Sequence, residues 1–240
     1  MEPLSSTGPD DRAVREEIQN FIYENPLTSF MANLGHRKVR NLKRSLWRGH
    51  GTAETLDLCC GMGHNAEFRN SFERFTGLDH SGTFLELARN RFPSERFVEA
   101  SVLGREWPLT EHTFDFITAN QALEHFSNED LRVILRNVSR YLAKGGRFIY
   151  VIPLDHSFAV NLGRKLTSER HMRKRFWNLD YRHWLRNREH INDYANITRE
   201  VQAAFVLERE VFLPFNVPVV HLNAFNIGVC SVREGQPRGS

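Results

Sequence analysis

The sequence predicts an α/β protein whose sheet is doubly wound and mostly parallel, with an antiparallel closing strand. The first observation is the alternation of short apolar runs with helical patterns across residues 51–153, which is typical of βαβ units. The second is a turn with two glycines, Gly61 and Gly63, directly after the first apolar run. The third is a pair of strand-like segments, 207–215 and 224–233, which suits the antiparallel edge of an otherwise parallel sheet.

The bulk composition excludes several classes of protein. The 240 residues are 40% hydrophobic and 25% charged, which is enough for a packed core in one domain of the larger α/β kind. The formal net charge of +3 is too small to indicate nucleic-acid binding by itself. No apolar stretch approaches the roughly 20 residues of a membrane span, and the start, "MEPLSSTGPDDR", has no secretory pattern. We therefore expect no nucleic-acid partner, no integral membrane span and no secretory signal.

The three cysteines, Cys59, Cys60 and Cys230, show neither a CxxC pattern nor a Cys/His pair at zinc spacing. A bridge between the adjacent pair would be strained. We therefore expect reduced thiols, a cytoplasmic setting and no bound metal.

Two helices are predicted to form an N-terminal cap over residues 1–50. The first covers 10–25, with Asp10 or Asp11 as the N-cap, and its apolar residues Val14, Ile18, Phe21 and Ile22 share one face. Pro26 interrupts the pattern, and a second, basic amphipathic helical region follows over 27–49.

Five strands and their connecting helices are predicted in the core, residues 51–153. The strands are expected at 55–60, 74–80, 96–101, 114–123 and 147–153, and the helices at 64–72, 82–92 and 128–143. Gly145 and Gly146 follow the last helix, and glycine suits the left-handed residue that ends a helix. We therefore expect that helix to be capped there.

The alternation stops after the fifth strand. Residues 154–192 are rich in arginine, histidine and aromatic residues and are predicted to form a helical lid that binds the substrate. A closing helix at 194–205 and the two closing strands make up the region 193–233, and 234–240 is expected to be a disordered tail.

Two acids lie beside the glycine turn, and their positions indicate the ligand. In doubly wound sheets, ligands bind at the carboxyl ends of the strands, where the strand order reverses. Asp57, near the end of the first strand, would oppose a pyrophosphate but favour an ammonium or sulfonium group. Asp79 ends the second strand, and a carboxylate can accept two hydrogen bonds from a ribose diol. S-adenosylmethionine (SAM) carries a ribose diol, a cationic centre and an amino-acid tail, and fits both acids.

Five segments occur in the order and at the spacing of a known enzyme family. They are "LDLCCGMG", "GLDHS", "EASVL", "FDFITANQALEHF" and "LAKGGRFIYVIP". Over roughly residues 52–153 the chain thereby resembles the class I SAM-dependent methyltransferases, in particular the type-11 group of small-molecule enzymes. The resemblance implies a Rossmann-like fold, SAM as the cofactor and S-adenosylhomocysteine as the product. Two positions depart from the family pattern: Cys59 replaces the first motif glycine, and Ser101 stands where the adenine-side loop commonly carries an acid. Whether these changes weaken SAM binding stays open.

The resemblance also implies site residues. The residues expected to bind the cofactor are Asp57, Cys59, Gly61, Gly63, Asp79, His80, Ser101, Val102, Asn120 and Gln121. His125 follows the fourth strand, near the expected approach of the methyl acceptor, and histidine titrates near neutrality, so it is the candidate catalytic base. The residues expected to bind the substrate are Tyr23, His156, Tyr181 and Tyr194.

The predicted reaction is in-line transfer of a methyl group from SAM to an oxygen or nitrogen of a small-molecule acceptor. The arginines of the lid suit an acceptor with an anionic group. Four alternatives remain: methylation of a lipid-linked or quinone-type acceptor at a membrane surface, methylation of RNA, a non-catalytic SAM-binding regulatory module, and a dinucleotide-dependent dehydrogenase, which the loose G-x-G-x-x-A of "GMGHNA" permits. The oligomeric state is open, with a homodimer as one option.

Overall fold

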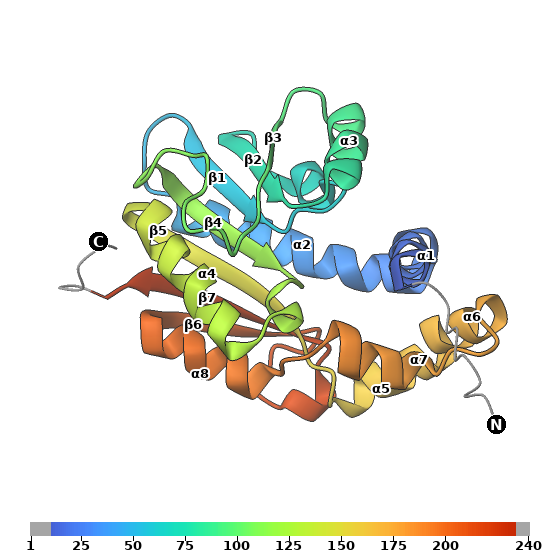
Figure 1. Cartoon of the computed structure of the whole chain (residues 1–240). Coiled ribbons are helices and arrows are strands. Elements are labelled where there is room, and N and C mark those ends of the chain that lie inside the picture. Colours follow the sequence, from blue (N-terminus) through green and yellow to red (C-terminus); the bar gives the residue numbers. More distant parts are fainter. Residues whose placement is uncertain (1–10, 234–240) are drawn as a thin grey trace.

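The computed structural model describes residues 11–233 and arranges them as a seven-stranded sheet with helices on both faces (Figure 1). The strand order is β3-β2-β1-β4-β5-β7-β6, and only β7 runs antiparallel to its two neighbours. This confirms the predicted fold class. The strands are β1 (Ala53–Leu58), β2 (Glu73–Asp79), β3 (Arg96–Glu99), β4 (Phe114–Asn120), β5 (Leu142–Pro153), β6 (Phe205–Leu213) and β7 (Phe225–Val232).

The two closing strands form the antiparallel edge of the sheet, as the sequence predicted, and the last strand, β7, lies between β5 and the outermost strand, β6. β7 pairs with β5 on one side and with β6 on the other. Its residues Ile227, Val229 and Cys230 are buried, so β7 is buried on both faces. β6 carries Glu208 and Arg209 exposed at the sheet edge, and charged side chains on an edge strand oppose further strand pairing.

Gly228 in β7 lies directly opposite Tyr150 in β5. A Cβ at Gly228 would lie 2.2 Å from the Tyr150 ring, which is fully buried. We expect Gly228→Ala to lower the free energy of unfolding by about 1–3 kcal/mol, because the ring must leave its packed position. Urea denaturation measures this. Gly163→Ala is the matched control: a Cβ there meets nothing within 4 Å, so that change in a helix should not destabilise the protein. Equal effects of the two substitutions would contradict the packing argument.

Four helices cover the sheet. They are α2 (Pro26–Leu46), α3 (Gly82–Arg91), α4 (Asn128–Tyr141) and α8 (Tyr194–Ala204). Alternate residues of each strand face the two layers: Leu56 and Leu58 of β1 pack in the cluster with α4 and α8, whereas Ala53 packs with α2. Pro26 begins α2 rather than merely ending the helix before it, and the Asn25 side chain caps α2 by accepting from two backbone N–H groups.

Several predicted boundaries were wrong. The helix expected over 64–72 is only the 3₁₀ helix η1 (His64–Phe68). α4 ends at Tyr141, because Leu142 already pairs with Phe114 as the start of β5. Gly145 does have a positive φ of 79°, but it lies in an irregular part of β5 rather than at the end of the helix. The fourth strand ends at Asn120, and the short 3₁₀ helix η2 (Leu123–His125) follows it.

The N-terminal helix packs against the insertion. The elements involved are α1 (Asp11–Glu24), α5 (Phe158–Leu166), α6 (Ser168–Arg175), α7 (Tyr181–Trp184) and the π-helical turn η3 (Leu185–Glu189). Val14 and Ile18 of α1 share an apolar cluster with Met172 and Trp184, and Figure 1 shows α1, α6 and α7 beyond one end of the sheet. We call α1 together with residues 154–192 the lid. The predicted N-cap Asp10 and the tail 234–240 lie outside the described residues.

Two sequence expectations about composition can be compared with the structure. All three cysteines lie in the described range and are unpaired. Within residues 11–233 no helix has the length and apolar character that crossing a membrane requires.

Candidate active site

The turn after β1 enters the left-handed backbone region three times. Gly61 and Gly63 have φ of 51° and 76°, and Cys59 has φ of 52°. A Cβ on Gly63 would also lie 3.0 Å from the ring of Phe97. The Gly63 N–H donates to the Cys60 carbonyl oxygen at 2.9 Å and closes the turn. The turn therefore keeps the backbone conformation of a glycine loop at Cys59, where a cysteine replaces the glycine. The Cβ of Cys59 adds a steric cost in the left-handed region.

Asp57 stabilises this turn through hydrogen bonds. It is fully buried, and its carboxylate accepts hydrogen bonds from Asn65 Nδ2 at 2.8 Å and from Thr118 Oγ1 at 2.7 Å. Asn65 belongs to η1, directly after the turn, so Asp57 ties the turn to β4. Burial raises the pKa of Asp57, and the nearby charge of Asp79 also raises it. The two hydrogen bonds and the charge of Lys43 act in the opposite direction and lower it, so that the pKa is about 6.

Asp57 should make stability depend on pH. Its folded pKa of about 6 lies above the ordinary value, so its contribution to stability is full below about pH 4 and is lost as the pH rises through 6. We expect Asp57→Asn to gain about 2–3 kcal/mol relative to the wild type between pH 4 and pH 7. Urea midpoints at the two pH values measure the gain. A difference between the two proteins that is the same at both pH values would show that Asp57 is not the titrating group.

Asp79 ends β2 beside the turn. Its Oδ2 accepts from the Gly61 N–H at 2.9 Å, and its Oδ1 accepts from the Ser81 N–H at 2.9 Å. Each carboxylate oxygen can accept a second hydrogen bond, so both oxygens can still bind a diol. His80, also predicted to bind the cofactor, is largely exposed, and its Nδ1 lies 3.5 Å from Asp79 Oδ1.

The carboxyl end of β4 lies next to β1 in the sheet. Asn120 ends β4, and its Oδ1 is buried without a hydrogen-bond partner. Gln121 follows with a positive φ of 50°, and its N–H donates to Val151 in β5. The turn, Asp79 and Asn120 therefore lie at the carboxyl ends of three adjacent strands, β1, β2 and β4. The strand order reverses at this point, and doubly wound folds bind their ligands there.

The other predicted cofactor residues follow β3. Ser101 is exposed and accepts from the Leu103 N–H at 3.2 Å. Val102 is buried, and its carbonyl oxygen accepts from Trp107 Nε1 at 3.3 Å. This loop is therefore held by its own hydrogen bonds, with the serine hydroxyl near its surface.

Tyr23 brings the end of α1 to the turn. Its ring centroid lies 3.5 Å from that of His64 in η1. Burial, and next the charge of Asp57, raise the pKa of the Tyr23 hydroxyl above its ordinary range. Among the predicted substrate residues, Tyr23 is the one that the structure places directly beside the glycine turn through its contact with His64.

The other three predicted substrate residues lie elsewhere. His156 is exposed after β5. Tyr181 is buried in the apolar cluster of the lid. Tyr194, at the start of α8, donates to Glu210 Oε1 at 3.2 Å. Their predicted contacts with a substrate stay predictions.

His125 lies in η2, five residues after the end of β4, and 37% of its side chain is exposed. Its Nδ1 lies 2.7 Å from the Glu189 carbonyl oxygen. A carbonyl can only accept, so Nδ1 carries the proton and Nε2 holds a free lone pair. Desolvation, and next the charge of His190, lower the pKa of His125 to about 4. The ring is therefore neutral at pH 7.

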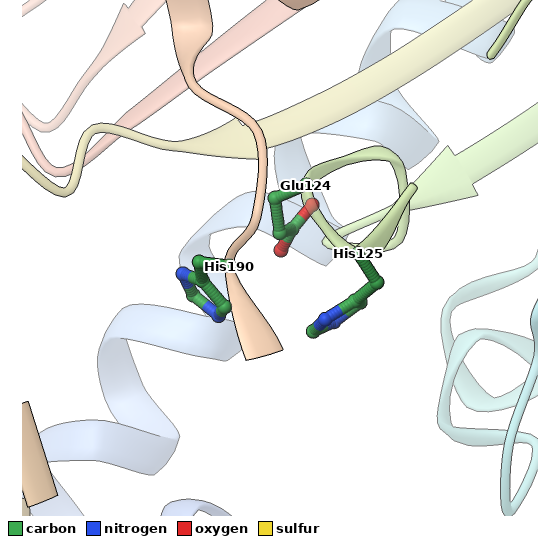
Figure 2. Close-up of side chains that lie close together, drawn as sticks. All are labelled: Glu124, His125 and His190. Carbon is green, nitrogen blue, oxygen red and sulfur yellow. The ribbon is translucent and has the colours of Figure 1, made fainter. Parts of the chain in front are cut away.

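Two further residues meet His125, and neither was among the predicted site residues. Figure 2 shows the side chains of Glu124, His125 and His190 converging on one space, and one ligand atom from each lies within 4.8 Å of the others. Burial raises the pKa of Glu124 well above its ordinary value. Asp155, just after β5, binds His190 Nδ1 and Arg164; burial would raise its pKa, but these two partners hold it at about 2. The sequence signal was the Glu-His pair in "LEHF".

Part of the chain is similar in sequence to known methyltransferases. Residues 55–146 match the family described as "Methyltransferase domain". The chain is 34% identical over 106 residues to an uncharacterized methyltransferase, YcgJ, of Bacillus subtilis, which covers 42% of this chain and 40% of that protein. It is 40% identical over 75 residues to trans-aconitate 2-methyltransferase of an Enterobacter species, which covers 30% of this chain and 29% of that protein. The chain thus matches less than half the length of either curated relative.

A solved structure extends the similarity beyond the matched segment. A SAM-dependent methyltransferase from Clostridium acetobutylicum superimposes with a TM-score of 0.63 at 14% identity, covering 91% of this chain and 99% of that one. At this identity the similarity shows the fold. Together with the family match, it confirms the predicted resemblance to methyltransferases.

Proposed function

Because residues 55–146 of this chain belong to the methyltransferase domain family, we propose that the protein transfers the methyl group of SAM to an oxygen or nitrogen atom of a small-molecule acceptor. The observation that carries this proposal is the pairing of the glycine turn with His125. The turn, Asp79 and Asn120 lie at the ends of adjacent strands and would form the cofactor side, and His125 lies in η2, which follows β4.

The proposed reaction is an in-line displacement at the methyl carbon. The acceptor's oxygen or nitrogen forms a bond to that carbon while the bond from sulfur breaks, and S-adenosylhomocysteine leaves. The acceptor's proton passes to Nε2 of His125, which has a free lone pair, and then to water. Asp79 orients the ribose, and the protein mainly aligns the reactants and excludes water. A small anionic acceptor is supported by the relative named trans-aconitate 2-methyltransferase.

Titration calorimetry of the purified protein with SAM, S-adenosylhomocysteine and NAD tests the cofactor. We expect micromolar binding of the first two and none of NAD. Hydroxylated and amino acceptors are then screened for methyl transfer. Binding of NAD alone would favour the dehydrogenase alternative. SAM binding without transfer to any acceptor class would favour the regulatory module.

One surface supports a second candidate, a lipid-linked acceptor at a membrane surface. Phe158, Leu162 and Leu166 lie four residues apart on α5, so they share one face, and they are 70%, 46% and 65% exposed. The exposed Lys165 adjoins this face, and basic residues are attracted to anionic headgroups. Cosedimentation with phosphatidylserine vesicles tests this candidate: Phe158→Ser with Leu166→Ser should abolish it, whereas Leu87→Ser, an exposed apolar position on α3, should not. An absence of wild-type cosedimentation rejects this candidate.

The RNA alternative requires a basic track joined to the active site. A cavity of about 450 Å³ is lined by Arg40, Arg44 and Arg69. It adjoins residues 70–72, directly before β2, so it lies at the amino end of a strand whose carboxyl end bears Asp79. This basic cluster therefore does not favour RNA as the acceptor.

A further inference from the structure

We propose that Glu124, His125 and His190 form a binding site for one divalent transition-metal cation, with zinc as the best match. The site was not expected, because it shows none of the short sequence spacings of zinc ligands. Its role toward the acceptor, described below, rests on the proposed methyl transfer.

The two imidazoles are arranged as metal ligands usually are. A metal-binding histidine typically donates its second ring N–H to a carbonyl or carboxylate, which fixes the ring and its tautomer. His125 Nδ1 faces the Glu189 carbonyl oxygen, and His190 Nδ1 faces the Asp155 carboxylate. Both rings therefore leave Nε2 free to bind a cation.

Glu124 supplies an independent reason for a cation. Its side chain is buried, with the residue 2% exposed, and Oε2 has no hydrogen-bond partner. A buried carboxyl oxygen without a partner is costly. A cation between Glu124 and the histidines would bind that oxygen. Its positive charge would also offset the repulsion between the carboxylates of Glu124 and Asp155.

The donor set points to the kind of cation. Two imidazoles and one carboxylate are the ligands of several catalytic zinc sites, which keep a fourth position open for water or substrate. Around zinc, such ligand atoms would be roughly 3.4 Å apart, as tetrahedral geometry at normal bond lengths requires. The three ligand atoms here lie within 4.8 Å of one another. A bound cation would therefore have to draw the three side chains closer together. Hard cations such as magnesium prefer oxygen ligands, whereas two of the three ligands here are nitrogens.

The site lies just after β4, where the acceptor is expected to approach, so the open position suits an acceptor oxygen. A cation there lowers the pKa of a bound hydroxyl. The hydroxyl proton would then pass to solvent, and the oxygen would form its bond to the methyl carbon as the sulfur–carbon bond breaks. In this state His125 Nε2 binds the cation and does not accept the proton itself.

A purely structural role is the competing explanation. The same contacts join the lid to η2, and the Asn192 N–H also donates to the Glu124 carbonyl oxygen at 3.0 Å. Such a role predicts loss of stability in variants but no metal affinity, so direct metal binding separates the two explanations.

The test uses the full-length protein after removal of metal with a chelator. Co²⁺ is added while its visible absorption is recorded, and Zn²⁺ is then added in competition. We expect one Co²⁺ per chain, displaced by Zn²⁺. Glu124→Gln and His190→Asn should each weaken the affinity at least about tenfold. His50→Asn, an exposed histidine before β1, should leave the affinity unchanged.

Failure of the wild type to bind either cation overturns the proposal, as does unchanged binding in both variants. Circular dichroism identifies an unfolded variant, and His190→Asn in the lid serves if the buried Glu124→Gln does not fold. A separate SAM titration distinguishes the two proposals. Metal binding without SAM binding rejects the proposed function and keeps the cation site, whereas SAM binding without metal binding does the reverse.

Discussion

Replacing Asp79 with alanine should weaken SAM binding by about 100-fold or more while the chain stays folded. Its carboxylate is expected to accept two hydrogen bonds from the ribose diol, and bonds to a charged group contribute about 1.5–3 kcal/mol each. The carboxylate also accepts from the Gly61 and Ser81 N–H groups, so its loss loosens the turn as well. Titration calorimetry measures the affinity, and circular dichroism confirms folding.

The matched control is Glu86→Ala, which removes an exposed acid from the neighbouring helix α3. It should bind SAM as the wild type does. Asp79→Asn keeps the shape of the side chain and one acceptor oxygen, so its affinity should lie between those of the wild type and Asp79→Ala. Normal SAM binding by a folded Asp79→Ala would show that the ribose assignment is wrong.

Replacing His125 with glutamine should lower kcat by about 10²–10⁴ while SAM affinity changes little. The ring lies in η2 beyond the cofactor side, so the variant loses the group that activates the acceptor. Because the pKa of His125 is lowered to about 4, its ring is neutral throughout pH 5–8. The wild-type rate should therefore show no step from His125 in that range.

His50→Gln is the control for this substitution and should keep the wild-type rate. A parallel loss of SAM affinity in His125→Gln would indicate a structural role for the histidine instead. If the cation site exists, chelation of the wild type should slow turnover and Zn²⁺ should restore it, whereas a histidine that accepts the proton directly would be insensitive to both.

The fold was predictable where local pattern and tertiary structure agree. The alternation of apolar runs and helical patterns predicted five strands of a parallel sheet, and the structure contains all five. It could not place β7, since the choice between an edge and an interior position depends on pairing with β5, which is distant in the chain. The end of α4 was missed for the same reason: the pairing of Leu142 with Phe114 overrides the glycine signal at Gly145.

Some of the site residues could also be predicted from local sequence, and others could not. Asp57, Gly61, Gly63 and Asp79 were recognisable because they lie close together in sequence around one turn. The cluster of Glu124, His125 and His190 was not recognisable. About 65 residues separate His190 from the other two, and only the folding of the lid brings them together. His190 stood among several lid histidines, and no local spacing singled it out. Only the tertiary contact with Asp155 and η2 distinguishes it.

The interior position of β7 also constrains how the chain can be synthesised. While residues 225–232 are still inside the ribosome, β5 has an open, apolar edge and β6 has no strand to pair with. Unpaired strand edges of this kind promote aggregation. A nascent chain that stalls before Phe225 should therefore need chaperones, and a stop codon there should remove two strands from the sheet rather than one.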